Sequence, residues 1–157
     1  MGYWAPASKG IVTVDGAGSM WTNSGDFAMG RNGDATLAII DGGLVVVGGT
    51  LSMNMYLNGE TYINMADGGK LALNGQADSS LEDFYSLIDG TDAICYWDAG
   101  VADWSMLTGA TLGTDYRLDY HTQGDLMGYT VLTVPEPTTM SLLALGACLP
   151  LFRRKRR

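Results

Sequence analysis

Asp-Gly turns that follow apolar segments recur along the chain and constrain its fold more than any other feature. They occur at Asp15, Asp41, Asp67 and Asp89, at intervals of 26, 26 and 22 residues (41 − 15, 67 − 41, 89 − 67). Such an interval is typical of arrays in which each unit covers one face of its neighbour. Glycine supplies 22 of 157 residues, about twice the usual ~7%, which indicates many positive-φ turns.

The segments between these turns have the patterns of β-strands. Residues 51–58 alternate apolar and polar side chains, and "KLAL" at 70–73 repeats this period of two. "LVVV" at 44–47 is apolar on both faces, as a strand buried on two sides would be. We therefore expect a mainly β fold with a parallel β-solenoid, right-handed and β-helix-like, over residues 10–76. An antiparallel meander with Asp-Gly hairpins is the alternative, because hairpins use the same turn residues.

The composition changes after Gln76. "SSLEDFYSLI" predicts a short helix near 81–88, with Ser80 and Asp83 in a capping arrangement. Strand-like alternation then returns, and "QGDLMG" at 123–128 predicts a hairpin loop. We expect residues 77–134 to form a β-rich region that closes the end of the solenoid, and residues 1–9 to form an irregular N-terminal segment.

The charge is divided between an acidic body and a basic tail. Five of the nine basic residues are the last five, and the rest of the chain has four basic against seventeen acidic residues, 4 − 17 = −13. Phosphate backbones would repel such a body, which excludes nucleic-acid binding. The two cysteines, Cys95 and Cys148, lie in unlike contexts and predict neither a disulfide nor a metal site.

Residues 135–157 combine a Pro-Glu-Pro tripeptide, an apolar run and a basic end. Pro135 and Pro137 hold the backbone extended around Glu136. Residues 138–152 are uncharged, and as a helix they would span roughly 22 Å of a hydrocarbon core of about 30 Å. We predict a single transmembrane helix there, kept with its basic end in the cytoplasm by Arg153, Arg154, Lys155, Arg156 and Arg157. A buried amphipathic helix would need a polar stripe that this run lacks, and a tail anchor without processing is a further alternative.

These C-terminal features resemble the PEP-CTERM protein-sorting signal. The resemblance implies a sorting motif at Pro135, Glu136 and Pro137, and an exosortase as the membrane-embedded processing partner. It also implies an exported protein of a Gram-negative bacterium, anchored in the inner membrane as a precursor and then delivered to the cell surface or extracellular matrix.

A second stretch, residues 14–45, is similar to the repeats of autotransporter-passenger-like, solenoid-forming bacterial surface proteins. The matching residues are Gly16, Gly18, Ser19, Trp21, Asn23, Gly25, Gly30, Gly33, Leu37, Ile39, Gly42 and Gly43. A sorting signal presupposes export, yet residues 1–14 have neither a basic n-region nor an apolar h-region. We therefore expect a C-terminal part of a longer exported protein, or a misplaced start codon.

Catalytic chemistry has little support in the sequence. Asp89, Asp92, Asp98 and Asp103 cluster as the carboxylates of a polysaccharide-cleaving β-helix enzyme could. Asp89 and Asp92, however, lie in turn-like contexts that favour aspartate, and His121 is the only histidine. We predict no catalytic residue, metal site or cofactor.

A glycan-binding or adhesin module anchored to the envelope is the alternative to a passive surface or matrix protein. Tyr96, Trp97 and Trp104 are close in sequence and could stack on the sugars of an extracellular polysaccharide. The competing interpretation is that these aromatic side chains fill the core of the closing region. We expect a non-enzymatic exported protein whose chemistry is done by the enzyme that processes it.

Overall fold

The computed structural model describes residues 8–31, 33–53, 59–90 and 93–136, and over these residues the fold is mainly β. The strands are β1 (Lys9–Asp15), β2 (Met20–Asn23), β3 (Phe27–Met29), β4 (Asp34–Ile40), β5 (Leu44–Val47), β6 (Leu51–Met53), β7 (Thr61–Met65), β8 (Lys70–Asn74), β9 (Ile88–Gly90), β10 (Ile94–Asp98), β11 (Asp103–Met106), β12 (Arg117–Tyr120) and β13 (Tyr129–Thr133). The helices are α1 (Leu81–Tyr85) and the short 3-10 helix η1 (Leu107–Gly109).

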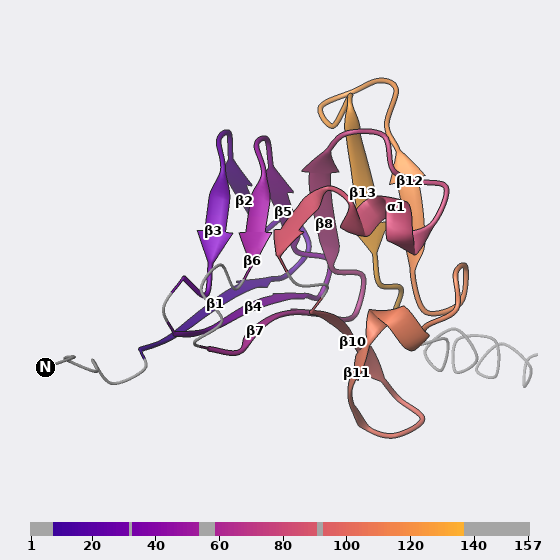
Figure 1. Ribbon diagram of the computed structural model, residues 1–157. Coiled ribbons are helices and arrows are strands. Elements are labelled where there is room, and N and C mark those ends of the chain that lie inside the picture. Colours follow the sequence, from indigo (N-terminus) through magenta and orange to yellow (C-terminus); the bar gives the residue numbers. More distant parts are fainter. Residues whose placement is uncertain (1–7, 32, 54–58, 91–92, 137–157) are drawn as a thin grey trace, which may run out of the picture.

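Three sheets form, and the chain visits them in a repeating order (Figure 1). Their strand orders are β1-β4-β7-β10-β11, β12-β13-β8-β5-β2 and β3-β6-β9. We call each passage through the three sheets a circuit: residues 9–29, 34–53 and 61–90. Among the strand pairs of the described residues, seven are parallel and three antiparallel. The sheets are therefore mixed and mostly parallel.

Each circuit lies in register with the next. Val12 pairs with Leu37 and Leu37 with Ile63, at offsets of 25 and 26 residues. The antiparallel-meander alternative is wrong, because the Asp-Gly turn at Asp41 joins β4 and β5, which belong to different sheets. Within the three circuits, neighbouring strands of one sheet come from successive circuits and run parallel.

The corner after the first sheet explains why two glycines follow the aspartate. Asp41 and Gly42 have φ of 51° and 80°, a left-handed pair that glycine adopts at the least cost. The next glycine meets a different constraint: a Cβ on Gly43 would lie 2.4 Å from the carbonyl oxygen of Val14. A Cβ on Gly69, one circuit later, would lie 2.1 Å from that of Ile39. The second glycine therefore allows the backbones of adjacent circuits to touch.

Two of the four Asp-Gly turns depart from the interval read in the sequence. Asp15 pairs with Ile40 rather than with Asp41, because the first corner holds one residue more than the second. Asp89 lies in β9 and pairs with Ser52 of β6, so it belongs to the third sheet and not to the corner. The 26-residue interval thus locates the second and third circuits well, and its extension to Asp89 is wrong.

Rows of apolar side chains fill the space between the sheets. The largest fully buried side chains are Phe84, Leu37, Ile39, Leu51, Met53, Ile63, Met65, Leu71, Leu73, Ile94, Leu107 and Leu132. Val46, Ala72 and Val131 form a second, smaller cluster, with Leu126 and Tyr129 packed against it. Both faces of the "LVVV" strand are therefore buried, as its sequence predicts.

Antiparallel strands follow the third circuit. β13 pairs with β8 and β11 pairs with β10, so two of the sheets continue with strands of reversed direction. Thr130 of β13 accepts a hydrogen bond from the N–H of Ala77 (2.9 Å) and donates one to the carbonyl of Gly75 (2.6 Å). These bonds fix the chain that leaves β8. β12 and β13 form the hairpin expected around residues 123–128.

A short helix lies where the sequence predicts one. The Ser80 side chain accepts a hydrogen bond from the Asp83 N–H at 3.0 Å and caps α1. α1 ends at Tyr85, earlier than the predicted boundary near 88, because Ile88 already begins β9. Phe84 points from this helix into the core.

Candidate functional site

The Pro-Glu-Pro tripeptide begins directly after a residue that is fixed in the fold. Val134 donates its N–H to the Gly69 carbonyl at 3.1 Å and accepts the Gly68 N–H at 2.8 Å. Its side chain is only 3% exposed, whereas Pro135 is half-buried and Glu136 is exposed. Pro137, the predicted transmembrane helix 138–152 and the basic residues 153–157 lie outside the described residues.

A pocket of about 220 Å³ lies beside Pro135 and Glu136. Its other walls include Tyr96, Trp97 and Asp98 of β10, together with Asp115. Burial, followed by the negative charges of Asp115 and Asp98, raises the pKa of the Tyr96 phenol above its ordinary value. The lining residues include three acids and no lysine or arginine, so the pocket suits a neutral or cationic group better than an anion.

The structure brings two of the three predicted stacking residues together. Trp97 and Trp104 face each other across the β10–β11 hairpin, with ring centroids 5.5 Å apart and ring planes at 77°. They are 38% and 37% exposed. Tyr96, the residue before Trp97 in β10, lies on the opposite face of the strand, in the row of Met65 and Ile39, and packs against the core. The rings thus form an edge-to-face pair and not one flat platform of three.

The predicted carboxylate cluster is divided between separate places. Asp89 lies in the third sheet, whereas Asp98 and Asp103 are partners at the end of the β10–β11 hairpin. Asp98 accepts the N–H of Gly100 at 2.8 Å and Asp103 accepts that of Trp104 at 2.8 Å. Asp92 lies outside the described residues. Both carboxylates therefore bond to backbone N–H groups of their own hairpin.

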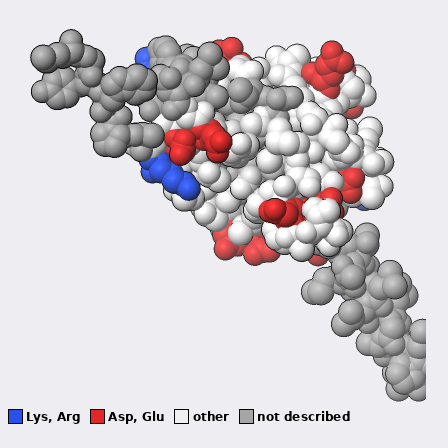
Figure 2. Space-filling model, turned by 60° about the horizontal axis from the view of Figure 1, so that its bottom comes forward, with Lys and Arg blue, Asp and Glu red and all other residues white. Residues whose placement is uncertain are grey.

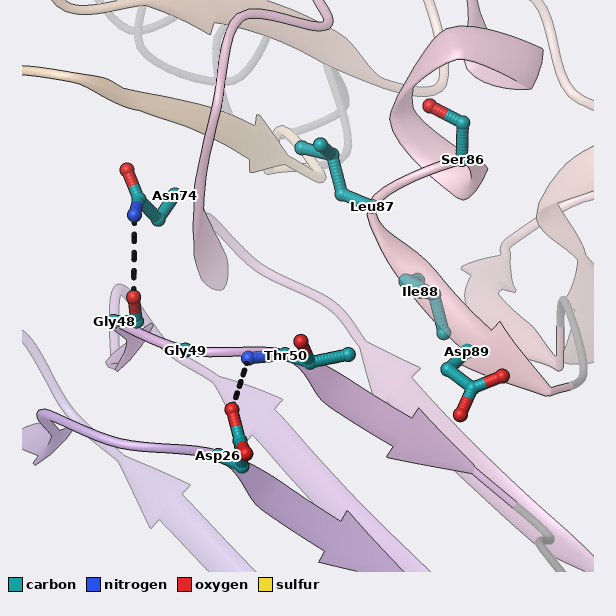
Figure 3. Close-up of a pocket in the computed structure, with 9 residues that line it drawn as sticks. All are labelled: Asp26, Gly48, Gly49, Thr50, Asn74, Ser86, Leu87, Ile88 and Asp89. Carbon is teal, nitrogen blue, oxygen red and sulfur yellow. Dashed lines mark hydrogen bonds between the residues drawn. The ribbon is translucent and has the colours of Figure 1, made fainter.

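A larger polar pocket of about 520 Å³ opens where the third circuit leaves the path of the second (Figure 3). Residues 48–50 join β5 to β6, whereas β8 reaches β9 through residues 75–87, which include α1. The detour leaves a hollow over the second-circuit corner. Its walls are Asp26, Gly48, Gly49, Thr50, Asn74, Ser86, Leu87, Ile88 and Asp89.

Backbone groups occupy part of the polar lining of this pocket. The Asp26 carboxylate accepts the Thr50 N–H at 2.8 Å, and the Asn74 amide donates to the Gly48 carbonyl at 3.2 Å. Figure 3 shows both bonds joining one circuit to the next. No local stretch of sequence signals this pocket, because successive circuits supply its walls. The one indirect signal is spacing: the residues of these two bonded pairs are 24 and 26 positions apart, close to the repeat interval.

Most of the charged side chains on the face of the body in Figure 2 are acidic. Figure 2 shows acidic side chains in several separate groups over one face, with little basic surface between them. Within the described ranges, no group of three or more histidine, cysteine, aspartate or glutamate side chains is placed to hold a metal ion. No helix in the same ranges is long and apolar enough to cross a membrane.

Comparison with known proteins identifies the C-terminal segment. No curated protein and no solved structure matches the chain. A family model described as the PEP-CTERM protein-sorting motif matches residues 133–157, so it begins at the last residue of β13. The chain therefore carries a PEP-CTERM sorting motif, which supports exosortase-dependent sorting of an exported protein.

Proposed function

We propose that this chain is a non-enzymatic surface or matrix protein that an exosortase recognises and processes at Pro135, Glu136 and Pro137. The match of the sorting motif to residues 133–157 is the observation that carries the proposal. Its position supports the idea, because the exposed Glu136 follows a backbone anchored through Val134. The tripeptide would extend from a fixed point instead of from a flexible linker.

We propose further that the repeated circuits form a β-solenoid, as expected for residues 10–76. In-register parallel pairing of three successive circuits supports this interpretation, as does a core built from stacked apolar rows. The antiparallel strands β11 and β13 would close its far end, as arrays need a terminal unit that no further repeat covers. The body would then act by presenting an elongated acidic surface.

In this proposal residues 138–152 anchor the precursor in the membrane, and we call this anchoring the membrane hold. Arg153 to Arg157 orient it, because clusters of basic residues remain on the cytoplasmic side. The acidic body would then lie outside the inner membrane. The hold is temporary, since the exosortase separates or transfers the body at the tripeptide.

Processing can be tested in a Gram-negative host with and without an exosortase. The full chain, given an N-terminal export signal, should lose its membrane association only when the enzyme is present. Glu136→Ala should block this release, because the substitution removes the one charge of the tripeptide, which is exposed. Glu82→Ala, at an exposed glutamate of α1, is the matched control.

Two outcomes would contradict the proposal. Release at the same rate in the host without an exosortase would show that another process frees the body. Equal release of the Glu136→Ala and Glu82→Ala chains would show that the tripeptide is not what the enzyme reads.

A further inference from the structure

The β10–β11 hairpin presents an apolar outward face. Trp97 pairs with Trp104 and Cys95 pairs with Met106, so these four side chains share one face of the two strands. Trp97, Trp104 and Met106 are 38%, 37% and 40% exposed, whereas Cys95 is buried beneath Met106, with its Sγ 3.5 Å from the Met106 Sδ. Figure 1 shows the hairpin standing out from the end of the body.

The hairpin that carries this face lies where the chain leaves the body. Trp97 and the first residues of the hairpin turn, Ala99 and Gly100, line one pocket with Pro135 and Glu136. The uncharged run begins two residues beyond Glu136, at Thr138. Two residues of extended chain span at most about 7 Å. If the run enters a bilayer at Thr138, Glu136 is therefore within about 7 Å of the bilayer surface, and the hairpin that lines the same pocket lies near that surface.

We propose that the outward face of the hairpin, formed by Trp97, Trp104 and Met106, rests on the surface of the bilayer that residues 138–152 enter. This inference rests on the proposed membrane hold of the precursor. Tryptophan suits such a place, because its ring is apolar and its indole N–H can bond to headgroups or water. The contact sets the orientation of the body relative to the membrane-embedded processing enzyme.

Charge determines which lipid the face accepts. The hairpin carries Asp98 and Asp103, and Asp115 and Glu136 lie at the adjoining pocket. An anionic headgroup layer repels these carboxylates over about one Debye length, ~8 Å at physiological salt. The contact is therefore apolar in origin and is strongest on a zwitterionic surface.

A glycan is a less suitable occupant for this face. Sugar rings stack on flat aromatic surfaces, whereas the planes of Trp97 and Trp104 are 77° apart, and Tyr96 lies on the other side of β10. The short tether to the apolar run also has no role in glycan binding. Contact with a lipid surface accounts both for the exposed rings and for their place beside the start of the apolar run.

Tryptophan fluorescence in vesicles tests the proposal with the full chain. Trp4→Phe with Trp21→Phe leaves the two hairpin tryptophans as the emitters. The control combines Trp4→Phe, Trp97→Phe and Trp104→Phe and leaves Trp21, which lies in β2 of the first circuit and packs on Phe27. β1 of that circuit is three strand spacings from β10, about 14 Å. Both proteins are reconstituted into phosphatidylcholine vesicles with plain or brominated acyl chains.

Brominated lipid should lower the hairpin emission roughly twofold and leave Trp21 emission nearly unchanged, because only rings in the interface reach the acyl chains. Replacing part of the lipid with phosphatidylglycerol should reduce the quenching at low salt, and added salt should restore it. Flotation of both proteins with the vesicles verifies that the C-terminal run has inserted.

Equal quenching of the two proteins, or none in either while both float, would overturn the inference and leave the proposed sorting untouched. Failure to float would overturn both the inference and the membrane hold on which it rests. If brominated lipid does not quench the hairpin tryptophans, and a soluble matrix polysaccharide shifts their emission maximum, the face binds glycan instead.

Discussion

Replacing Gly69 by alanine tests whether adjacent circuits touch through their backbones. The new Cβ would lie 2.1 Å from the Ile39 carbonyl oxygen, about 1 Å closer than packed interiors tolerate. The Ile39 oxygen also accepts the Ala66 N–H at 3.2 Å, and the neighbouring Lys70 N–H bonds to the Gly43 carbonyl at 2.9 Å. A separation of the circuits large enough to admit the methyl group would weaken both bonds.

The expected loss of stability follows from these contacts. Two hydrogen bonds contribute about 1 kcal/mol each, and overpacking costs about 1–3 kcal/mol. Gly69→Ala should therefore lower the free energy of unfolding by about 3–5 kcal/mol. Urea unfolding of the detergent-solubilised full chain, followed by tryptophan fluorescence and circular dichroism, measures this difference.

Gly25→Ala is the matched control for this measurement. A Cβ at Gly25 would meet no atom within 4 Å, and its φ lies outside the left-handed region. This substitution should change the free energy of unfolding by about 0.5 kcal/mol or less. If Gly69→Ala and Gly25→Ala unfold at the same urea concentration, the circuits do not pack through the second glycine of the corner, and the reasoning is refuted.

Two further predictions concern a buried hydroxyl and an ionisable ring. Thr130→Val removes the hydroxyl that bonds both the Ala77 N–H and the Gly75 carbonyl. It should lower the free energy of unfolding by about 2–4 kcal/mol, because both backbone groups lose their partner. Thr114→Val, at an exposed position, should change the free energy of unfolding little in the same assay. The raised pKa of Tyr96 stabilises the fold fully below the ordinary tyrosine pKa of about 10, and this stability is lost as pH rises through the folded-state value. Asp115→Asn should lower the Tyr96 pKa, and ring-labelled NMR titration should detect the shift; an unchanged titration would show that the Asp115 charge does not reach the ring.

Local patterns in the sequence predicted several elements of the body. The continuous apolar run predicted the buried strand of residues 44–47, and the alternation at 70–73 predicted β8. The Ser80 cap predicted the start of α1. These succeed because burial and capping depend on residues close in the chain. The interval between Asp41 and Asp67 likewise matches the 26-residue register of the second and third circuits.

The sequence was less informative where partners come from other circuits. For both glycines after Asp41 the sequence predicted only a turn with positive φ. Gly42 does have a positive φ, whereas a Cβ on Gly43 would contact the backbone of the preceding circuit. The sequence equated Asp89 with the corner aspartates, although a detour through α1 moves this residue to the third sheet. It also grouped Tyr96 with Trp97, although strand alternation places them on opposite faces.

By itself, the sequence determined the β character, the repeat interval, the acidic body and the sorting motif at the C-terminus. These are properties of composition, spacing and short motifs, which no distant contact alters. Only the tertiary structure decided which strands pair, where the two pockets open, and that Pro135 leaves the body beside Trp97. The physical reason is that register and proximity depend on contacts between segments far apart in the chain. Val134, the residue after β13, bonds to the Gly68 corner from 66 residues along the chain (134 − 68).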